Sequence, residues 1–181
     1  MDPRTKERTT GAAQSGNGAD GGKHLTFRLG RETYGIEVLG VQEIIRMTEI
    51  TRVPRAPRFV RGVINLRGRI TPVVDLRERF ALGAAGDTER TCIVVVEPRG
   101  ESVAMGLVVD EVLDVCDLAA EQIEPPPSFG REGAPRVLAG MAKVGEQVVL
   151  LLDIDRILSA EESDLVALSA ISSREPDELV H

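Results

Sequence analysis

The feature that most constrains the fold is an internal repeat. Matching residues recur at a single offset of 78 positions, and the pairs are Gly62 and Gly140, Asp75 and Asp153, Leu76 and Ile154, and Phe80 and Leu158. Upstream, YGIEVLGVQEII at 34–45 matches MGLVVDEVL at 105–113 at a slightly shorter offset. Each copy is a unit of about 60–70 residues, which is too small to bury a sufficient core separately. The two copies are therefore expected to share a core.

Short apolar or alternating runs bounded by turn residues fill both copies, among them LTFRL, TYGIEV, GVINL, ITPVVDL, TCIVVV, VLAGMAKV and QVVLLLDI. Many short strands at small spacing are typical of a sandwich or barrel. A capping box of Ser159 and Glu162 predicts an amphipathic C-terminal helix. Short helices are predicted at 39–45, 57–61, 76–81 and 119–123. The fold class is therefore all-β with short helices.

The chain divides into three parts. Residues 1–23 are rich in Gly, Ser, Thr and Asn without periodicity, which predicts a disordered N-terminal tail. Residues 159–181 are assigned to the C-terminal helix and tail. The folded domain is predicted over 24–160, with a first barrel at about 24–88 and a second barrel at about 89–158.

Composition argues against a catalyst. The two histidines, His24 and His181, lie at the start of the fold and at the last residue, so no His-based triad or His-rich metal site is expected. No phosphate loop or kinase motif occurs. Cys92 and Cys116 lie in apolar surroundings, which predicts buried free thiols. We expect no catalytic residue, metal or cofactor.

No stretch approaches the roughly 18 consecutive apolar residues that a spanning helix needs. The first 23 residues contain no apolar segment of signal-peptide type. We therefore expect a soluble, cytosolic protein with no direct insertion into a membrane.

The two repeated aspartates, Asp75 and Asp153, invite comparison with aspartic proteases, in which two carboxylates share a proton. Neither is followed by the Asp-Thr/Ser-Gly turn of those enzymes. Asp75 precedes Glu78 by three positions, which is typical of a helix N-cap with its capping box, and Asp153 can cap the turn at 154–158. Both aspartates are interpreted as caps.

Basic residues are concentrated in one region of an otherwise acidic chain. Residues 52–79 contain eight arginines and two acidic residues, whereas the whole chain has a net charge of −7. Such a face can attract nucleic acid, anionic lipid or an acidic protein. Platforms for single-stranded nucleic acid stack bases on aromatic rings, and this chain has four Phe, one Tyr and no Trp. An acidic protein partner or a solvated face without a partner fits the composition better.

The stretch RGVINLRGRITPVVDL at 61–76 predicts a hairpin with a two-residue turn at Arg67 and Gly68. Its alternating apolar residues, Ile64, Leu66, Ile70, Val74 and Leu76, are those that a barrel requires. At the repeat offset the second copy has a different turn and lacks Asn65, Arg67 and Pro72. The scaffold therefore does not need these three residues. Arg67 can present its planar donor fork to a partner's carboxylate, or to an acid of its own fold such as Glu43.

These segments resemble the CheW-type coupling proteins of bacterial chemotaxis. The similarity runs from about residue 24 to 160, and it rests on YGIEVLGVQEIIR, ITRVP, RGVINLRG, PVVDLR, GLVVDEV, AEQIEPPP and VVLLLDIDRIL. The resemblance implies two SH3-like five-stranded β-barrel subdomains and no catalysis. It also implies an adaptor that links the cytoplasmic tips of methyl-accepting chemoreceptors to the regulatory domain of the histidine kinase CheA in cytoplasmic signalling arrays. Other copies of the coupling protein are further possible partners.

The resemblance also implies a set of partner-binding residues, without saying which partner each one contacts. They are Val41, Glu43, Gly62, Asn65, Arg67 and Gly68. The tail at 1–23, the prolines at 125–127 and the segment 127–136 depart from the family pattern. Two alternatives stay open: a coupling protein of a chemosensory pathway whose output is not swimming, and, more remotely, a small β-barrel that binds nucleic acid through its arginines.

Overall fold

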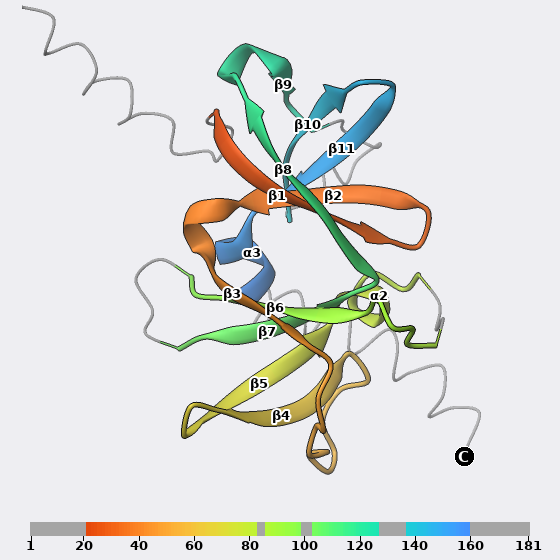
Figure 1. The fold of residues 1–181 in the computed structure, drawn as a ribbon, viewed down its shortest axis with the longest axis vertical. Helices are drawn as coiled ribbons and strands as arrows, with labels where there is room; N and C mark the ends of the chain where they lie inside the picture. The colour runs from red at the N-terminus through yellow and green to blue at the C-terminus, as the bar shows by residue number, and fades with distance from the viewer. Residues whose placement is uncertain (1–20, 83–85, 99–102, 127–136, 160–181) are drawn as a thin grey trace, which may run out of the picture.

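The computed structural model describes residues 21–82, 86–98, 103–126 and 137–159 (Figure 1). Most of these residues lie in short strands, as the alternating sequence pattern predicts. The elements are β1 (Gly22–Leu29), β2 (Glu32–Glu37), η1 (Val38–Gly40), β3 (Val41–Arg46), β4 (Val60–Leu66), β5 (Arg69–Asp75), α2 (Leu76–Arg79), β6 (Cys92–Val96), β7 (Met105–Val109), β8 (Glu111–Leu118), η2 (Ala120–Gln122), β9 (Ile123–Glu124), β10 (Leu138–Val144), β11 (Gln147–Leu152) and α3 (Ile154–Ser159).

Two sheets stand one above the other (Figure 1). In the described residues, the lower sheet has the strand order β3-β6-β7-β5-β4, and we call it, with α2, subdomain 1. The upper sheet has the order β8-β1-β2-β11-β10-β9, and we call it, with α3, subdomain 2. The predicted all-β class with two related subdomains is confirmed.

The boundary predicted between the two barrels, at residues 88 and 89, is wrong. The N-terminal hairpin β1–β2 pairs with β8 and β11 in subdomain 2, while β6 and β7 complete subdomain 1. The link is a parallel pairing in which Thr33 lies opposite Val149. Each subdomain therefore takes one hairpin from the other predicted half. Apolar alternation assigns a strand to a sheet face, but it does not identify the neighbouring strand.

The internal repeat is visible in the coordinates. Strands β4 and β10 have the same alternation of buried and exposed residues, and each ladder shifts register beside its glycine. In subdomain 1, β5 runs parallel to β7 with Val73 opposite Gly106. In subdomain 2, β11 runs parallel to β2 with Leu151 opposite Gly35. The two subdomains are thus built to one plan.

Gly62 lies where the lower sheet curls back on itself. Thr51, in the segment after β3, exchanges two backbone hydrogen bonds of 2.9 Å with Val63 on β4. A Cβ on Gly62 would collide with the Thr51 carbonyl oxygen, and its φ of 142° also disfavours a side chain. In subdomain 2, a Cβ on Gly140 would lie 2.8 Å from the Ile123 side chain. The repeated glycines therefore permit a close approach of two strands.

A single large core lies between the two sheets. Phe27 and Ile36 from subdomain 2 pack in one cluster with Val74, Val94 and Leu107 and other residues from subdomain 1. Two smaller clusters fill the interiors of the individual subdomains. Burial of apolar surface is the main favourable term in folding, and here most of it belongs to both subdomains jointly. The expected shared core is confirmed.

The predicted short helices have mixed outcomes. The helix at 76–81 is confirmed as α2, and 119–123 contains the 3-10 turn η2. The prediction at 39–45 is met only at 39–40, in the 3-10 turn η1, because β3 pairs with β6 from Val41 onward. Residues 57–61 form a turn that leads into β4 instead of a helix. Lateral pairing with an apolar strand outweighs the modest helix propensity of VQEI.

The predicted ends of the chain are only partly described. Strand β1 begins at Gly22, so the last two residues of the predicted tail belong to the sheet. Residues 1–20 of that tail lie outside the described residues, as does the helix predicted from the Ser159 capping box beyond residue 159.

Both repeated aspartates act as caps. Asp75 accepts a hydrogen bond from the Arg77 amide, and Asp153 accepts one from the Asp155 amide, each at 3.0 Å. The reciprocal half of the predicted capping box with Glu78 does not form, because the Asp75 amide donates to the Phe59 carbonyl instead. Asp75 also has a second role, in an ion network described below.

Replacing Val74 by aspartate should remove most of the folding stability. Val74 is 3% exposed in the shared core, where a carboxylate would have no cationic partner. We expect a loss of about 3–5 kcal/mol in the free energy of unfolding, measured by chemical denaturation. Val148→Asp is the matched control, because Val148 lies exposed on β11, and it should change stability by less than about 0.5 kcal/mol. Equal losses in both variants would contradict the assignment of the core.

Candidate functional site

The turn between β4 and β5 carries three of the six residues predicted to bind partners. Arg67 and Gly68 both have positive φ, 55° and 84°, as a type I′ hairpin turn requires. The Asn65 side-chain oxygen accepts a hydrogen bond of 2.9 Å from the Gly68 amide and so fixes the turn. Positive φ at arginine is strained, and such strain often marks a functional position. In the equivalent turn of subdomain 2 the positive φ falls on Gly145.

Arg67 makes a bidentate ion pair with Glu43 on β3. Its two terminal nitrogens lie 2.8 and 3.1 Å from the two carboxylate oxygens. The Arg67 side chain remains 74% exposed, whereas that of Glu43 is 22% exposed. Such an exposed pair contributes at most about 1 kcal/mol to stability. The pair fixes the direction of the guanidinium and leaves its outer surface open to a partner.

The structure therefore brings together Glu43, Asn65, Arg67 and Gly68, and we call these four residues the hairpin site. The other two predicted residues lie apart from it. Gly62 is buried on β4, where it contacts Thr51. The fold therefore requires a glycine at this position for a structural reason. Val41 lies at the start of β3, opposite Val96, and packs against the shared core.

An exposed isoleucine, Ile70, accompanies the hairpin site, and sequence reasoning missed it. Ile70, expected in the core, is 76% exposed on β5, one residue beyond the turn-closing Arg69. Ile44 on β3 is 44% exposed, but strand alternation directs it to the face opposite that of Glu43. At the start of β5, Arg69 and Ile70 are both exposed and Thr71 is buried, so burial there does not follow the apolar pattern of the sequence. Apolar side chains beside a fixed arginine are typical of protein-binding surfaces.

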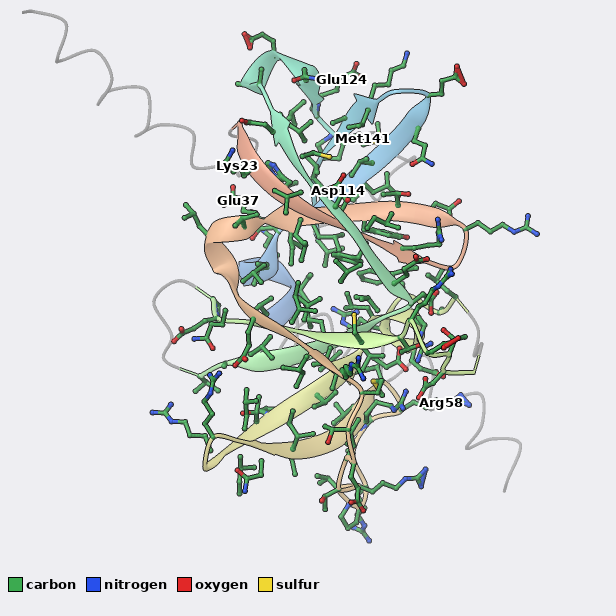
Figure 2. All side chains as sticks on the ribbon, in the orientation of Figure 1. Lys23, Glu37, Arg58, Asp114, Glu124 and Met141 are labelled. Carbon is green, nitrogen blue, oxygen red and sulfur yellow. The ribbon has the colours of Figure 1, made fainter. Side chains whose placement is uncertain are left out.

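The eight arginines of residues 52–79 do not form one basic face. Arg61, Arg77 and Arg79 turn inward, and Arg79 stacks over the Phe59 ring at 5.7 Å from its centroid. The arginines exposed in this region are Arg52, Arg55, Arg58, Arg67 and Arg69. Figure 2 shows Arg58 beside subdomain 1 and Glu124 at the top of the view, on subdomain 2. The basic segment of the sequence is therefore divided between exposed arginines and arginines that turn inward.

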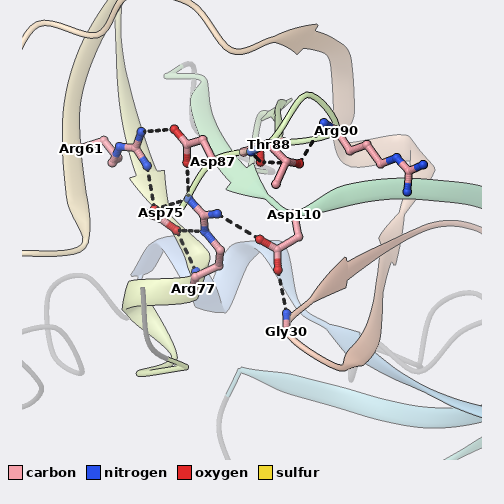
Figure 3. Close-up of polar contacts among 9 residues, drawn as sticks. Gly30, Arg61, Asp75, Arg77, Asp87, Thr88, Arg90 and Asp110 are labelled. Atoms are coloured by element: carbon pink, nitrogen blue, oxygen red, sulfur yellow. Dashed lines mark hydrogen bonds and ion pairs between the residues drawn. The ribbon is translucent and has the colours of Figure 1, made fainter. Parts of the chain in front are cut away.

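Arg77 is the centre of a buried ion network (Figure 3). Its side chain is 5% exposed and donates to Asp75 at 2.9 Å, to Asp87 at 2.9 Å and to Asp110 at 3.0 Å. Arg61, on β4, bridges Asp75 and Asp87 at 2.9 Å each. Sequence reasoning assigned Asp75 only as a cap, because the opposing charges of this network are dispersed along the chain.

The network shifts the ionisation of its members. Burial alone would raise the pKa of the Asp75 carboxyl, but hydrogen bonds from Arg77 and Arg61 and the charge of Arg77 hold it below its ordinary value. A hydrogen bond from Arg61, with further support from Arg77, lowers the pKa of Asp87 in the same way. The hydrogen bond to Asp75 raises the pKa of Arg77, so this group stays charged.

Both cysteines lie within the described residues. Cys92 and Cys116 are free, as predicted, but both are partly buried rather than buried. Burial raises the pKa of each thiol, which lowers its reactivity at neutral pH. Within the described ranges, no group of three or more His, Cys, Asp or Glu side chains is arranged to hold a metal ion, and no helix is long and apolar enough to cross a membrane.

Reversing the charge of Arg67 should weaken the fold only slightly. Arg67→Glu places two carboxylates together at the hairpin site, and we expect a loss of about 0.5–1 kcal/mol in thermal or chemical unfolding. The charge-swapped double variant Glu43→Arg/Arg67→Glu should recover most of that loss. If the single variant unfolds, Arg67 is a structural residue and the site assignment fails.

Acid should weaken the ion network in a defined pH window. A carboxyl whose folded-state pKa is lowered stabilises the fold above its unfolded value, near 3.8, and loses that contribution as pH falls through the folded-state pKa. We therefore expect the free energy of unfolding to fall below about pH 4–5. Asp87→Asn, at the rim of the network, should flatten that decline, whereas Asp117→Asn, on the surface of β8, should leave it unchanged. An unaltered pH profile in Asp87→Asn would contradict this role.

Comparison with known proteins identifies the relatives of this fold. The model of the CheW-like domain matches residues 23–162. Chemotaxis protein CheW of Klebsiella aerogenes is 44% identical over 146 residues, which cover 81% of this chain and 87% of that protein. Protein FrzA of Myxococcus xanthus is 33% identical over 142 residues, with coverage of 78% and 88%.

A solved structure agrees with this assignment. The crystal structure of scaffolding protein TtCheW from Thermoanaerobacter tengcongensis is 34% identical in sequence and superposes with a TM-score of 0.69. The match covers 76% of this chain and 92% of that chain. The predicted family resemblance is confirmed by the domain match, by the curated relatives and by the fold. This chain belongs to the CheW-like family.

Proposed function

We infer that this protein is a chemotaxis adaptor that couples chemoreceptors to a histidine kinase. The single observation that carries the inference is the family match over residues 23–162, together with relatives named chemotaxis protein CheW and a structural neighbour described as a scaffolding protein. The proposed partners are the regulatory domain of CheA and the cytoplasmic tips of methyl-accepting chemoreceptors. The proposed location is a cytoplasmic signalling array, and the adaptor performs no catalysis of its own.

The hairpin site supplies a suitable docking edge. Arg67 is fixed by Glu43 and by the strained turn, so a partner carboxylate that binds its open side loses little side-chain entropy to order it. Arginine is enriched at protein interfaces, and Ile70, exposed and opposite Asn65 in the ladder, supplies an apolar neighbour. The second copy has no arginine at its turn, which favours a role in binding over a role in the scaffold.

Coupling then follows from differential binding. A receptor changes the activity of the kinase only if its contacts with the complex differ in free energy between the active and inactive states. The adaptor contributes by binding both partners at once, so that this difference passes through two interfaces. In an array each contact is repeated many times, and individually weak interfaces can suffice.

A second output is favoured by one specific observation. Protein FrzA of Myxococcus xanthus is among the relatives, at 33% identity, and it carries a name of its own rather than that of a chemotaxis protein. A coupling protein of a chemosensory pathway that controls something other than swimming is therefore the second candidate. Deletion of the gene, followed by separate assays of swimming bias and of surface behaviour, distinguishes the two outputs.

Co-sedimentation tests the adaptor function directly. Purified protein should pellet with assemblies of receptor-tip fragments and the CheA regulatory domain, and omission of either partner should reduce the recovery. A gel-shift assay with single-stranded DNA and RNA at two salt concentrations serves as the comparison, because phosphate contacts are strongly salt-dependent. A protein that ignores both protein partners but shifts nucleic acid would refute the adaptor function.

Charge reversal at the hairpin site tests where a partner docks. Arg67→Glu should reduce affinity for at least one of the two partners by roughly tenfold, the effect of about 1.4 kcal/mol. The Glu43→Arg/Arg67→Glu variant should restore stability without restoring binding, because the partner meets the opposite charge pattern. Glu146→Arg, on the equivalent turn of subdomain 2, is the matched control for a turn substitution. Binding restored by the swap would mean that only the intramolecular ion pair matters.

A further inference from the structure

The ion network reaches across the boundary between the subdomains. Asp110 lies between β7, which belongs to subdomain 1, and β8, which belongs to subdomain 2. One of its carboxylate oxygens accepts a hydrogen bond of 3.0 Å from the side chain of Arg77, which lies on α2. The other oxygen accepts a hydrogen bond of 2.7 Å from the Gly30 amide in the β1–β2 turn. Figure 3 shows the connected contacts: Arg61 and Arg77 both bind Asp75 and Asp87, and Asp110 then joins Arg77 to the Gly30 amide.

The network begins at the base of the hairpin that carries the hairpin site. Arg61 lies on β4, and its guanidinium holds Asp75 at the end of β5 and Asp87 in the segment before β6. The Asp110 amide also donates to the Arg28 carbonyl on β1 at 3.0 Å. The network therefore joins the β4–β5 hairpin of subdomain 1 to the β1–β2 hairpin of subdomain 2.

The repeat provides an internal comparison, because the pseudo-equivalent crossover is built differently. There η1 connects β2 with β3, the Glu97 amide donates to the Gly40 carbonyl at 3.0 Å, and Ile154 packs so closely that a Cβ on Gly40 would lie 2.6 Å from it. At the repeat offset Asp155 occupies the position of Arg77. A duplicated scaffold can therefore connect its two sheets without a buried arginine.

The shared core and the network constrain the sheets in different ways. Apolar burial depends on the area removed from water and has no preferred direction, so by itself it constrains the angle between the two sheets less sharply than directional contacts do. Charge-assisted hydrogen bonds depend on both distance and angle. Arg77 and Asp75 are almost fully buried, where a shift that broke one bond would leave charge without a partner.

We propose that the connection from Arg77 through Asp110 to Gly30 is a positioning element that fixes the angle between the two subdomains, and that coupling depends on this angle. The second part rests on the proposed function, because it requires partners on both subdomains. Asp110 touches neither partner in this proposal. It acts by holding the hairpin site in a constant relation to the surfaces of subdomain 2.

Residual dipolar couplings of the full chain test the angle directly. In the wild type, backbone couplings from both subdomains should fit one alignment tensor. In Asp110→Ala, the couplings within each subdomain should still fit the structure, but the two subdomains should need different tensors. Asp110→Asn should change the angle between the subdomains less than Asp110→Ala does. The asparagine side-chain oxygen can still accept the hydrogen bond from the Gly30 amide, although the negative charge opposite Arg77 is lost. Asp117→Ala, an exposed acid on β8, should match the wild type.

An Asp110→Ala protein that keeps one tensor and the wild-type angle would overturn the proposal. If that variant does not fold, Asp110→Asn decides in the same way, and an unchanged angle there overturns it. The measurement needs no partner, so it remains decisive even if the wild type binds neither receptor nor kinase, an outcome that would refute only the proposed function.

Reconstituted kinase assays test the consequence for coupling. Asp110→Ala should bind each partner separately with unchanged affinity, while receptor-dependent control of the kinase falls by roughly fivefold or more. A merely structural role would lower stability without this split. Full coupling with an altered angle, or loss of separate binding in a folded variant, would each overturn the claim that coupling depends on the angle.

Discussion

The apolar layer between the two sheets is shared, and the rest of the molecule is arranged around that fact. Each subdomain encloses only a small interior cluster, whereas residues such as Phe27 and Leu107, contributed by different subdomains, are fully buried together. A unit of about 60–70 residues buries too little surface to be comfortably stable, so neither sheet is an independent domain. The interface between them is a core, and its geometry is part of the fold.

Two of the differences between the copies bear on the proposed binding and coupling, and both lie on subdomain 1. The hairpin turn gains a fixed arginine, which is a candidate for binding, and the helix that follows gains a buried arginine, which is a candidate for positioning. The second copy keeps the same glycine contact, the same parallel strand pairing and the same aspartate cap without either addition. Features present in both copies are therefore those that the scaffold requires, and features present in one copy are candidates for function.

Local chemistry made part of this architecture predictable. Repeated aspartates before short helices, a two-residue turn and a shared core all follow from short-range rules, and the pairing of Arg67 with Glu43 was one of the two roles considered for that arginine. The exchange of hairpins between subdomains could not be predicted, because equivalent strands carry equivalent apolar patterns. The ion network was missed for a related reason: Asp87 and Asp110 approach Arg77 only after the strands have assembled.

The exchange of hairpins has a consequence for how the chain is made. Subdomain 1 uses a continuous segment from β3 to β7, and a nascent chain emerging from the ribosome can complete that sheet early. Of the described strands, β1 and β2 are synthesised before the others, yet the parallel partner of β2 is the last one, β11, with Thr33 opposite Val149. Pairing between strands so far apart in the chain forms slowly. Until β11 is made, β2 can pair with β1 alone among the described strands, but apolar residues of this hairpin such as Phe27 can already pack against subdomain 1. Subdomain 1 can thus serve as the surface on which subdomain 2 is completed.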